Sequence, residues 1–160
     1  MLQFKSALAP YAVGRRVDSE EWNTITRTYE AADSIVRLGF GQPVKHGTGP
    51  HTCNDMIATT GQNFLGITEA MPNLPRSGDG YARYDNVPIC EWGVIAVETE
   101  GNLVKGGVAR WNSATKKWTA AAQSATVVTI PGTTFEETAT APGIGAIRLR
   151  RPNPALTIAT

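Results

Sequence analysis

Residues 81–119 constrain the fold more than any other stretch, because they hold three of the four tryptophans and the densest run of strand-forming residues. β-Branched and aromatic side chains dominate this run, and such side chains suit a pleated, half-buried strand. Gly101, Gly106 and Gly107 interrupt the run and supply backbone freedom where the chain must turn. The pattern predicts a β-meander.

Within this stretch the alternation of inward and outward side chains is imperfect. Val94 and Ala96 share one parity, whereas Ile95 and Val97 share the other. No single polar face can therefore be drawn, because side chains alternate between the two faces of a strand. Two interpretations fit this pattern. Either the strand is covered on both faces, or its register changes at Gly93, where an extra residue would bulge the strand.

The second half of the stretch contains a predicted β-hairpin. Residues 108–111 and 116–119 have the composition of strands, and they flank the polar residues 112–115. A polar connection of this length is typical of a hairpin. We therefore expect the two flanking segments to pair antiparallel.

Short strand candidates continue on both sides of the meander, separated by turns rich in glycine and proline. They are residues 23–29, 35–38, 44–46, 55–59, 64–68, 126–130, 133–138 and 144–150. Residues 19–32 also fit a helical period, but the threonines of residues 23–29 favour a strand. Pro131 and Gly132 are expected to form a turn between two of the candidates. The predicted fold class is therefore all-β, a single β-barrel or jelly-roll-like domain.

The two ends of the chain differ in composition from the middle. Residues 1–23 carry scattered apolar residues with no sustained period, which is typical of an extended arm that gains order along another surface. We expect residues 24–151 to form the domain. Residues 152–160 contain two prolines and are expected to form a short C-terminal tail.

Charge and hydropathy argue against two kinds of partner. Fifteen basic residues against fourteen acidic ones leave a formal net charge of +1. The positive electrostatic field of such a chain is too weak for a non-specific nucleic-acid binder. No apolar run approaches the roughly 20 residues of a membrane span, and the first residues lack the pattern of a signal peptide. We therefore expect no nucleic-acid or membrane partner and a cytoplasmic compartment, where the two cysteines would stay reduced.

The best metal-ligand candidates are His46, His51 and Cys53, because imidazole and thiolate are preferred zinc donors. No second ligand cluster accompanies them, so an exposed loop that carries two histidines is the favoured interpretation. The sequence also lacks a nucleophile elbow and a spaced pair of carboxylates. It therefore predicts no catalytic, cofactor or metal site.

Several pieces of the chain occur in an order that resembles the structural cement proteins that decorate the capsids of tailed bacteriophages. They are RTYEA, LGFGQPVKHGT, FLGITEA, GDGYARYDNVPICEWGVIAVETEG, GGVARWNSATKKWTA and VVTIPGTTFEETATAPGIGAIRLR. The resemblance leaves out the N-terminal arm and the proline-containing tail.

This resemblance implies a β-barrel or jelly-roll domain without enzymatic activity, assembled in the host cytoplasm onto the outer surface of the major capsid protein shell. It implies a subunit that bridges capsomers, because linked contacts hold more firmly than any single one. Copies on a symmetric lattice meet at rotation axes, so a homodimer or homotrimer is expected. The candidate partner-binding residues are the apolar anchors and the arginines of the arm: Phe4, Tyr11, Arg15, Arg16 and Trp22.

An alternative function is a carbohydrate-binding jelly-roll module on the virion surface. Trp92, Trp111 and Trp118 would supply the rings that stack on sugars. In small β-domains, however, such tryptophans more often fill the core.

Overall fold

The computed structural model describes residues 12–18, 21–31, 37–56, 63–71, 80–140 and 142–150. Within these residues the chain forms strands and no helix, so no described helix is long and apolar enough to span a membrane. The strands are β1 (Asn23–Tyr29), β2 (Pro43–His46), β3 (Thr52–Asp55), β4 (Phe64–Thr68), β5 (Asn86–Glu100), β6 (Val108–Asn112), β7 (Lys117–Thr119), β8 (Val127–Phe135) and β9 (Gly143–Leu149). The predicted all-β class is confirmed.

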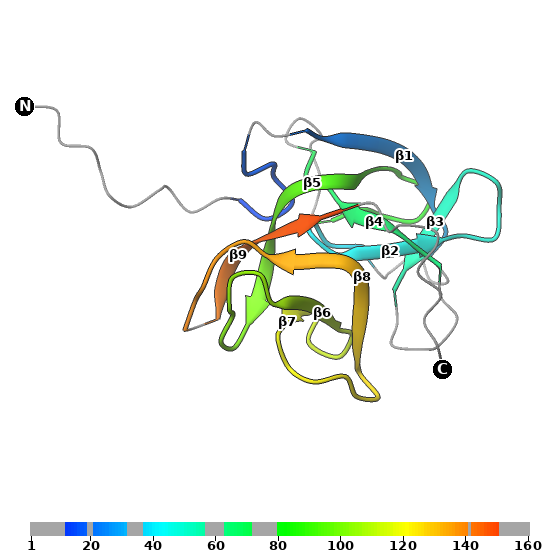
Figure 1. Cartoon of the computed structure of the whole chain (residues 1–160). Helices are drawn as coiled ribbons and strands as arrows, with labels where there is room; N and C mark the ends of the chain where they lie inside the picture. Colours follow the sequence, from blue (N-terminus) through cyan, green and yellow to red (C-terminus); the bar gives the residue numbers. More distant parts are fainter. Residues whose placement is uncertain are drawn as a thin grey trace, which may run out of the picture.

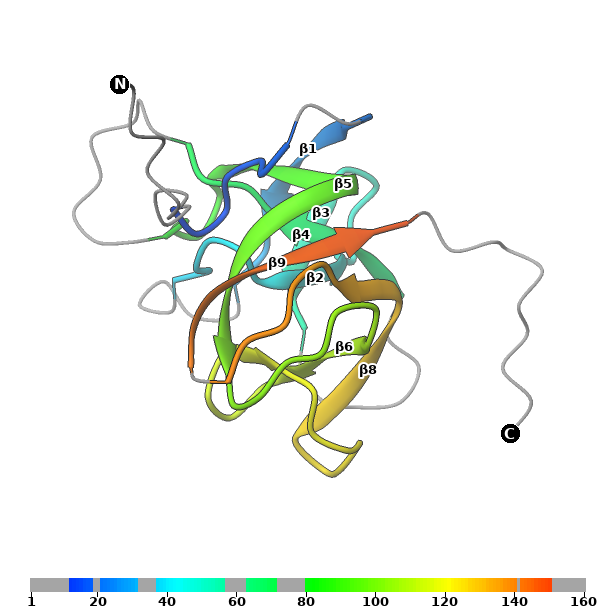
Figure 2. The same ribbon diagram turned by 60° about the vertical axis from the view of Figure 1, so that its left-hand side comes forward.

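Strand β5 organises the sheet, because strands from both ends of the chain return to it. The strand order is β1-β3-β2-β4-β5-β7-β6-β8-β9, with additional pairings of β1 and of β9 with β5. The pairing of β9 with β5 closes β5, β7, β6, β8 and β9 into a five-stranded barrel, called here the barrel. The pairing of β1 with β5 closes the remaining strands into a second ring. Figures 1 and 2 show β5 as a long curved strand that runs from the second ring into the barrel.

The residues around Gly93 mark the passage of β5 from one ring to the other. Up to Trp92, β5 pairs with β1, whereas from Gly93 onward it pairs with β9. The side chains of residues 94–97 are all buried, so the strand is covered on both faces there, as the first interpretation predicts. The register also shifts, but two residues before the predicted place. Asn23 lies opposite Trp92 and Thr24 opposite Cys90, which leaves Glu91 as the extra residue.

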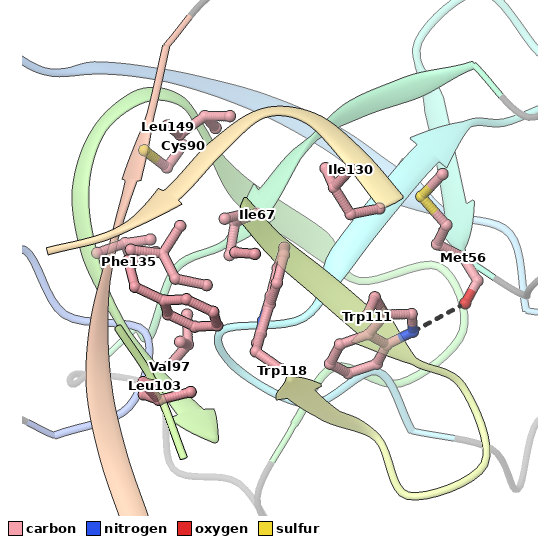
Figure 3. Packing of buried hydrophobic residues seen from close by; sticks show 13 residues of the cluster. Met56, Ile67, Cys90, Val97, Leu103, Trp111, Trp118, Ile130, Phe135 and Leu149 are labelled. Atoms are coloured by element: carbon pink, nitrogen blue, oxygen red, sulfur yellow. Dashed lines mark hydrogen bonds between the residues drawn. The ribbon is translucent and has the colours of Figure 1, made fainter. Parts of the chain in front are cut away.

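Two hydrophobic clusters fill the two rings. The larger cluster lies in the barrel and also receives Met56, Ile67 and Cys90 from the second ring, so the rings share part of their core (Figure 3). Burying a large apolar side chain contributes about 1.5–3 kcal/mol each, so these clusters supply the main stabilising term. The second cluster consists of Tyr29, Ala31, Leu38, Val44, Cys53, Leu65, Tyr81, Val87 and Ile89.

Two tryptophans lie at the centre of the larger cluster. The rings of Trp111 and Trp118 pack edge to face with centroids 5.7 Å apart. Each buried indole has a backbone acceptor: Trp111 Nε1 donates to the Met56 carbonyl at 3.2 Å, as Figure 3 shows, and Trp118 Nε1 donates to the Gly41 carbonyl at 2.7 Å. The expectation that tryptophans fill the core is confirmed for these two.

Several predicted strands are confirmed, including residues 23–29 and 64–68 and the hairpin of β6 and β7. The predicted turn at Pro131 and Gly132 is wrong, because β8 runs through both residues. The register of β6 shifts between Val108 and Arg110, so residues 130–133 of β8 lie opposite Ala109 alone and form a bulge that includes Pro131 and Gly132.

Of the predicted strand at residues 55–59, the structure describes only residues 55 and 56, of which Asp55 ends β3, and the rest lies outside the described residues. Of the candidate at residues 35–38, the structure describes only the end. There Leu38 forms an isolated bridge with Tyr81.

Candidate partner-binding surfaces

Residues 12–18 of the predicted arm lie along β5 and belong to the folded body. Gly14 N donates to the Ala96 carbonyl at 2.7 Å, Ala96 N donates to the Arg15 carbonyl at 2.9 Å, and Val17 N donates to the Val94 carbonyl at 3.0 Å. Arg16 thereby forms an antiparallel bridge with Ile95. Residues 12–18 of the predicted arm are therefore held against the barrel by backbone hydrogen bonds.

The structure brings two of the predicted partner-binding residues together. The Arg16 guanidinium lies 5.6 Å from the centroid of the Trp22 ring, in a cation–π contact. Trp22 is half-buried, packs against the barrel core, and donates from Nε1 to Thr24 Oγ1 at 2.7 Å. Part of the Trp22 side chain is therefore already in contact with the folded body and is not available to a partner. Arg15 is exposed, whereas Phe4 and Tyr11 lie outside the described residues.

A groove beside the β8 bulge is a surface that sequence reasoning missed. Its volume is about 570 Å³, and its lining is mostly apolar. The residues that line it are Lys105, Gly106, Val108, Thr129, Ile130, Pro131, Gly132, Thr133, Thr134, Phe135, Glu136 and Arg150. The bulge is held in place by Thr133, whose buried hydroxyl lies 3.0 Å from the Ala109 carbonyl and 2.8 Å from the Ile130 carbonyl. The only sequence signal was the Pro-Gly pair, which suits a turn equally well.

The charges and exposed side chains of this groove define the kind of partner that suits it. Val108 remains 44% exposed there. Glu136 is paired with Arg148, with 2.5 Å between Oε1 and Nε. Lys105 and Arg150 have no ion pair among the described residues. An apolar lining with two available cations suits an extended segment that carries apolar and acidic side chains.

A second exposed feature precedes β5. Tyr84 is 68% exposed and has a φ of 69°, a conformation that non-glycine residues rarely adopt. Its amide donates to the Tyr29 carbonyl at 2.9 Å, and the Arg83 guanidinium lies 4.8 Å from its ring centroid. Tyrosine and arginine are enriched at binding hot spots, so this pair is another candidate contact.

The loop that carries the metal-ligand candidates His46, His51 and Cys53 is arranged around a carboxylate. His46 and His51 are exposed and Cys53 is buried. Within the described ranges, no group of three or more histidine, cysteine or acidic residues is arranged to hold a metal ion. The loop instead surrounds the Glu30 carboxylate, which accepts from Thr48 N at 2.8 Å and from Gly49 N at 3.1 Å.

The comparisons with known proteins agree with this fold. The family model of the structural cement protein (E217 gp24/Pam3 gp6) matches residues 2–150. The chain belongs to the structural cement protein family. The predicted resemblance is thereby confirmed, and the family assigns this cement protein a structural role in a phage capsid and a place in the virion.

Among solved structures, a chain described as "The capsid of Myoviridae Phage XM1" is similar to this cement protein. The two share 14% sequence identity with a TM-score of 0.71, over 93% of this chain and 96% of that chain. At this identity the likeness concerns the fold. No curated protein matches the sequence.

The alternative carbohydrate-binding function loses most of its support. Trp111 and Trp118 are buried, so their faces cannot stack on a sugar. Trp92 is half-buried, and its indole nitrogen is buried without a hydrogen-bond partner in the described structure.

Proposed function

We propose that this cement protein binds the outer surface of the shell formed by the major capsid protein, bridges neighbouring capsomers and stabilises the DNA-filled head. The match of the cement family to residues 2–150 carries the proposal, because it spans the folded body and all but the first residue of the arm. The protein would act by holding neighbours together and not by catalysis.

The architecture supports this role. β5 has pairing partners on both sides, since β1 and β4 flank its first half and β9 and residues 14–17 flank its second half. A body closed in this way loses little conformational freedom when it binds, so more of each contact appears as affinity.

We assign the capsid contacts to the N-terminal arm and to the groove beside β8. The arm would contribute Phe4 and Tyr11 as anchors, and the exposed guanidiniums of Arg15 and Arg16 would meet acidic capsid surface. The groove would take an apolar and acidic segment of the shell. Two linked contacts of this kind hold a subunit more firmly than either alone.

The proposal is tested by adding the purified protein to expanded, undecorated capsids and counting bound copies per shell subunit by cryo-electron microscopy. Saturable decoration by the wild-type protein is expected, and its absence would overturn the function itself. Deleting residues 1–11 keeps the hydrogen bonds that Gly14 and Val17 make with β5, and should weaken decoration at least tenfold.

The groove is tested separately with the double variant Lys105→Glu/Arg150→Glu, which should also weaken decoration. The matched control is Arg37→Glu/Lys45→Glu, which changes the net charge equally at residues outside the groove and outside the Arg83 and Tyr84 pair. Equal losses in the two variants would show that only overall charge matters. Undiminished occupancy in a deletion or groove variant would retire that contact and leave the function standing.

Copies of a cement protein on a symmetric lattice meet at rotation axes, so we also propose self-association as a homodimer or homotrimer. The body itself offers an edge for such a contact.

A further inference from the structure

The outer edge of β1 is open over most of its length. On one side β1 pairs with β5 along residues 23–28, but on the other side it pairs with β3 only at Thr28 and Tyr29. In Figures 1 and 2, β1 lies at the outer margin of the folded body. Asn23, Thr24 and Thr26 are exposed.

Hydrogen bonds at the end of β1 establish which backbone groups face outward. Thr28 N donates to the His51 carbonyl, away from β5, whereas Tyr29 N donates to the Asp85 carbonyl on the β5 side. Since successive residues of a strand point their backbone groups to opposite sides, Thr26 and Thr24 direct theirs away from β5. Pro88 lies opposite Thr26 and has no N–H to offer, which agrees with this assignment.

These outward groups lack a strand partner in the part of the chain that the structure describes. The one acceptor that is satisfied is the Thr26 carbonyl, which receives a bond from Arg27 Nη1 at 2.9 Å. Unpaired edges of this kind template the addition of another strand.

Charges of both signs lie at this edge. Asn23 Nδ2 donates to Glu91 Oε2 at 2.5 Å, which holds this carboxylate beside the start of β1. Arg27 lies near the other end of the open edge. Neither Arg27 nor Glu91 has an ion-pair partner among the described residues.

We propose that two copies of this chain pair through β1, antiparallel about a two-fold axis at Ile25. In this register Thr24 of one copy lies opposite Thr26 of the other, and the two pairs exchange four backbone hydrogen bonds. Arg27 lies opposite Asn23 of the second copy and so next to its Glu91. The edge is therefore complementary to itself in both hydrogen bonding and charge.

The proposal assigns a second role to the Arg27 guanidinium. In the single chain it donates to the Thr26 carbonyl and satisfies this one acceptor of the edge. In the pair, Thr24 N–H of the second copy takes over that carbonyl, and the guanidinium becomes free to meet Glu91. The inference deepens the self-association part of the proposed function and does not depend on capsid binding.

The test compares Thr26→Pro with Thr26→Ala by sedimentation equilibrium without capsids. Proline removes an N–H that has no partner in the single chain, and edge strands tolerate proline on their open side. The wild type and Thr26→Ala should be dimers at about 100 µM, whereas Thr26→Pro should dimerise at least tenfold more weakly. An unchanged melting temperature would show that Thr26→Pro still folds.

A charge exchange decides the register even where the proline variant unfolds. Arg27→Glu and Glu91→Arg should each weaken the dimer several-fold, and the double variant should recover most of that loss. A wild-type monomer at about 100 µM, a trimer, an unaffected Thr26→Pro dimer or a double variant without recovery would overturn the proposal. Because capsids are absent, failure here is distinct from failure to decorate.

Discussion

The indole nitrogen of Trp118 donates a 2.7 Å hydrogen bond to the carbonyl of Gly41, which lies 77 residues earlier in the chain. Trp118 is on β7 in the barrel, and Gly41 lies in the turn before β2 in the second ring. One side chain thus fills the barrel core and also ties the two rings together.

Replacing Trp118 with phenylalanine should therefore cost about 2–4 kcal/mol of unfolding free energy, because it leaves a small cavity and an unpaired carbonyl. Trp92→Phe is the matched control, since the Trp92 indole nitrogen is buried without a partner in the described structure. Urea unfolding should show a clearly smaller loss for the control. Equal losses would mean that the hydrogen bond to Gly41 contributes nothing.

Gly93 should be intolerant of alanine for two separate reasons. Its φ is 133°, and an added Cβ would overlap the Trp22 ring. Gly101→Ala isolates the conformational cost of about 1–2 kcal/mol, because φ is 71° there and no atom lies within 4 Å of the added Cβ. We expect Gly93→Ala to lose more stability than this control and to shift the tryptophan fluorescence. Similar unfolding midpoints for the two variants would argue against the Trp22 contact.

The Glu30 carboxylate should make stability depend on acidity. Its hydrogen bonds from the Thr48 backbone and the Thr52 side chain, in that order, lower its pKa from 4.5 to about 2. Because the folded pKa lies below the unfolded one, the contribution is complete above pH 4.5 and is lost as the pH falls toward 2. Glu30→Gln should flatten the pH dependence of urea unfolding in that window.

The same variant should speed hydrogen exchange at the amides of Thr48 and Gly49, which donate to this carboxylate. Glu21→Gln, at an exposed residue with no hydrogen bond in the described structure, serves as the control. If the amides of Thr48 and Gly49 were equally protected from hydrogen exchange in both variants, the Glu30 carboxylate would not be what holds the loop.

Both thiols should be unreactive in the folded protein. Cys53 and Cys90 are free and buried, and burial raises the pKa of Cys53 to about 12 and that of Cys90 further still. Since the thiolate is the reactive form, labelling with iodoacetamide at pH 8 should be negligible until urea unfolds the protein. Mass spectrometry counts the labels, and rapid modification of either cysteine in the native state would contradict the buried placement.

Local features of the sequence predicted most of the strands correctly. The alternation in residues 23–29 and the polar connection at residues 112–115 act over a few neighbours, so they can be recognised without knowledge of the rest of the chain. The dipeptide at Pro131 and Gly132 could not be interpreted in this way. It suits a turn and a bulge equally, and only the pairing of β6 with both halves of β8 decided between them.

For the candidate surfaces too, the sequence indicated single residues, whereas the contacts between them depended on the tertiary structure. Arg15, Arg16 and Trp22 were recognisable from composition, but their contacts with β5 and with each other depend on the docking of residues 12–18. The groove beside β8 and the open edge of β1 were not recognisable at all, because each depends on which strand lies next to which.

The sequence alone therefore determined that this chain is an all-β protein, and the order of its pieces indicated its family. Only the tertiary structure decided that β1 and β9 both return to β5, which closes two rings and leaves one edge open. The physical reason is that strand formation follows from residues a few positions apart. Ring closure joins segments more than 40 residues apart in the chain. Because the pairing uses backbone groups that every strand has, the residues of one strand do not show which other strand it will pair with.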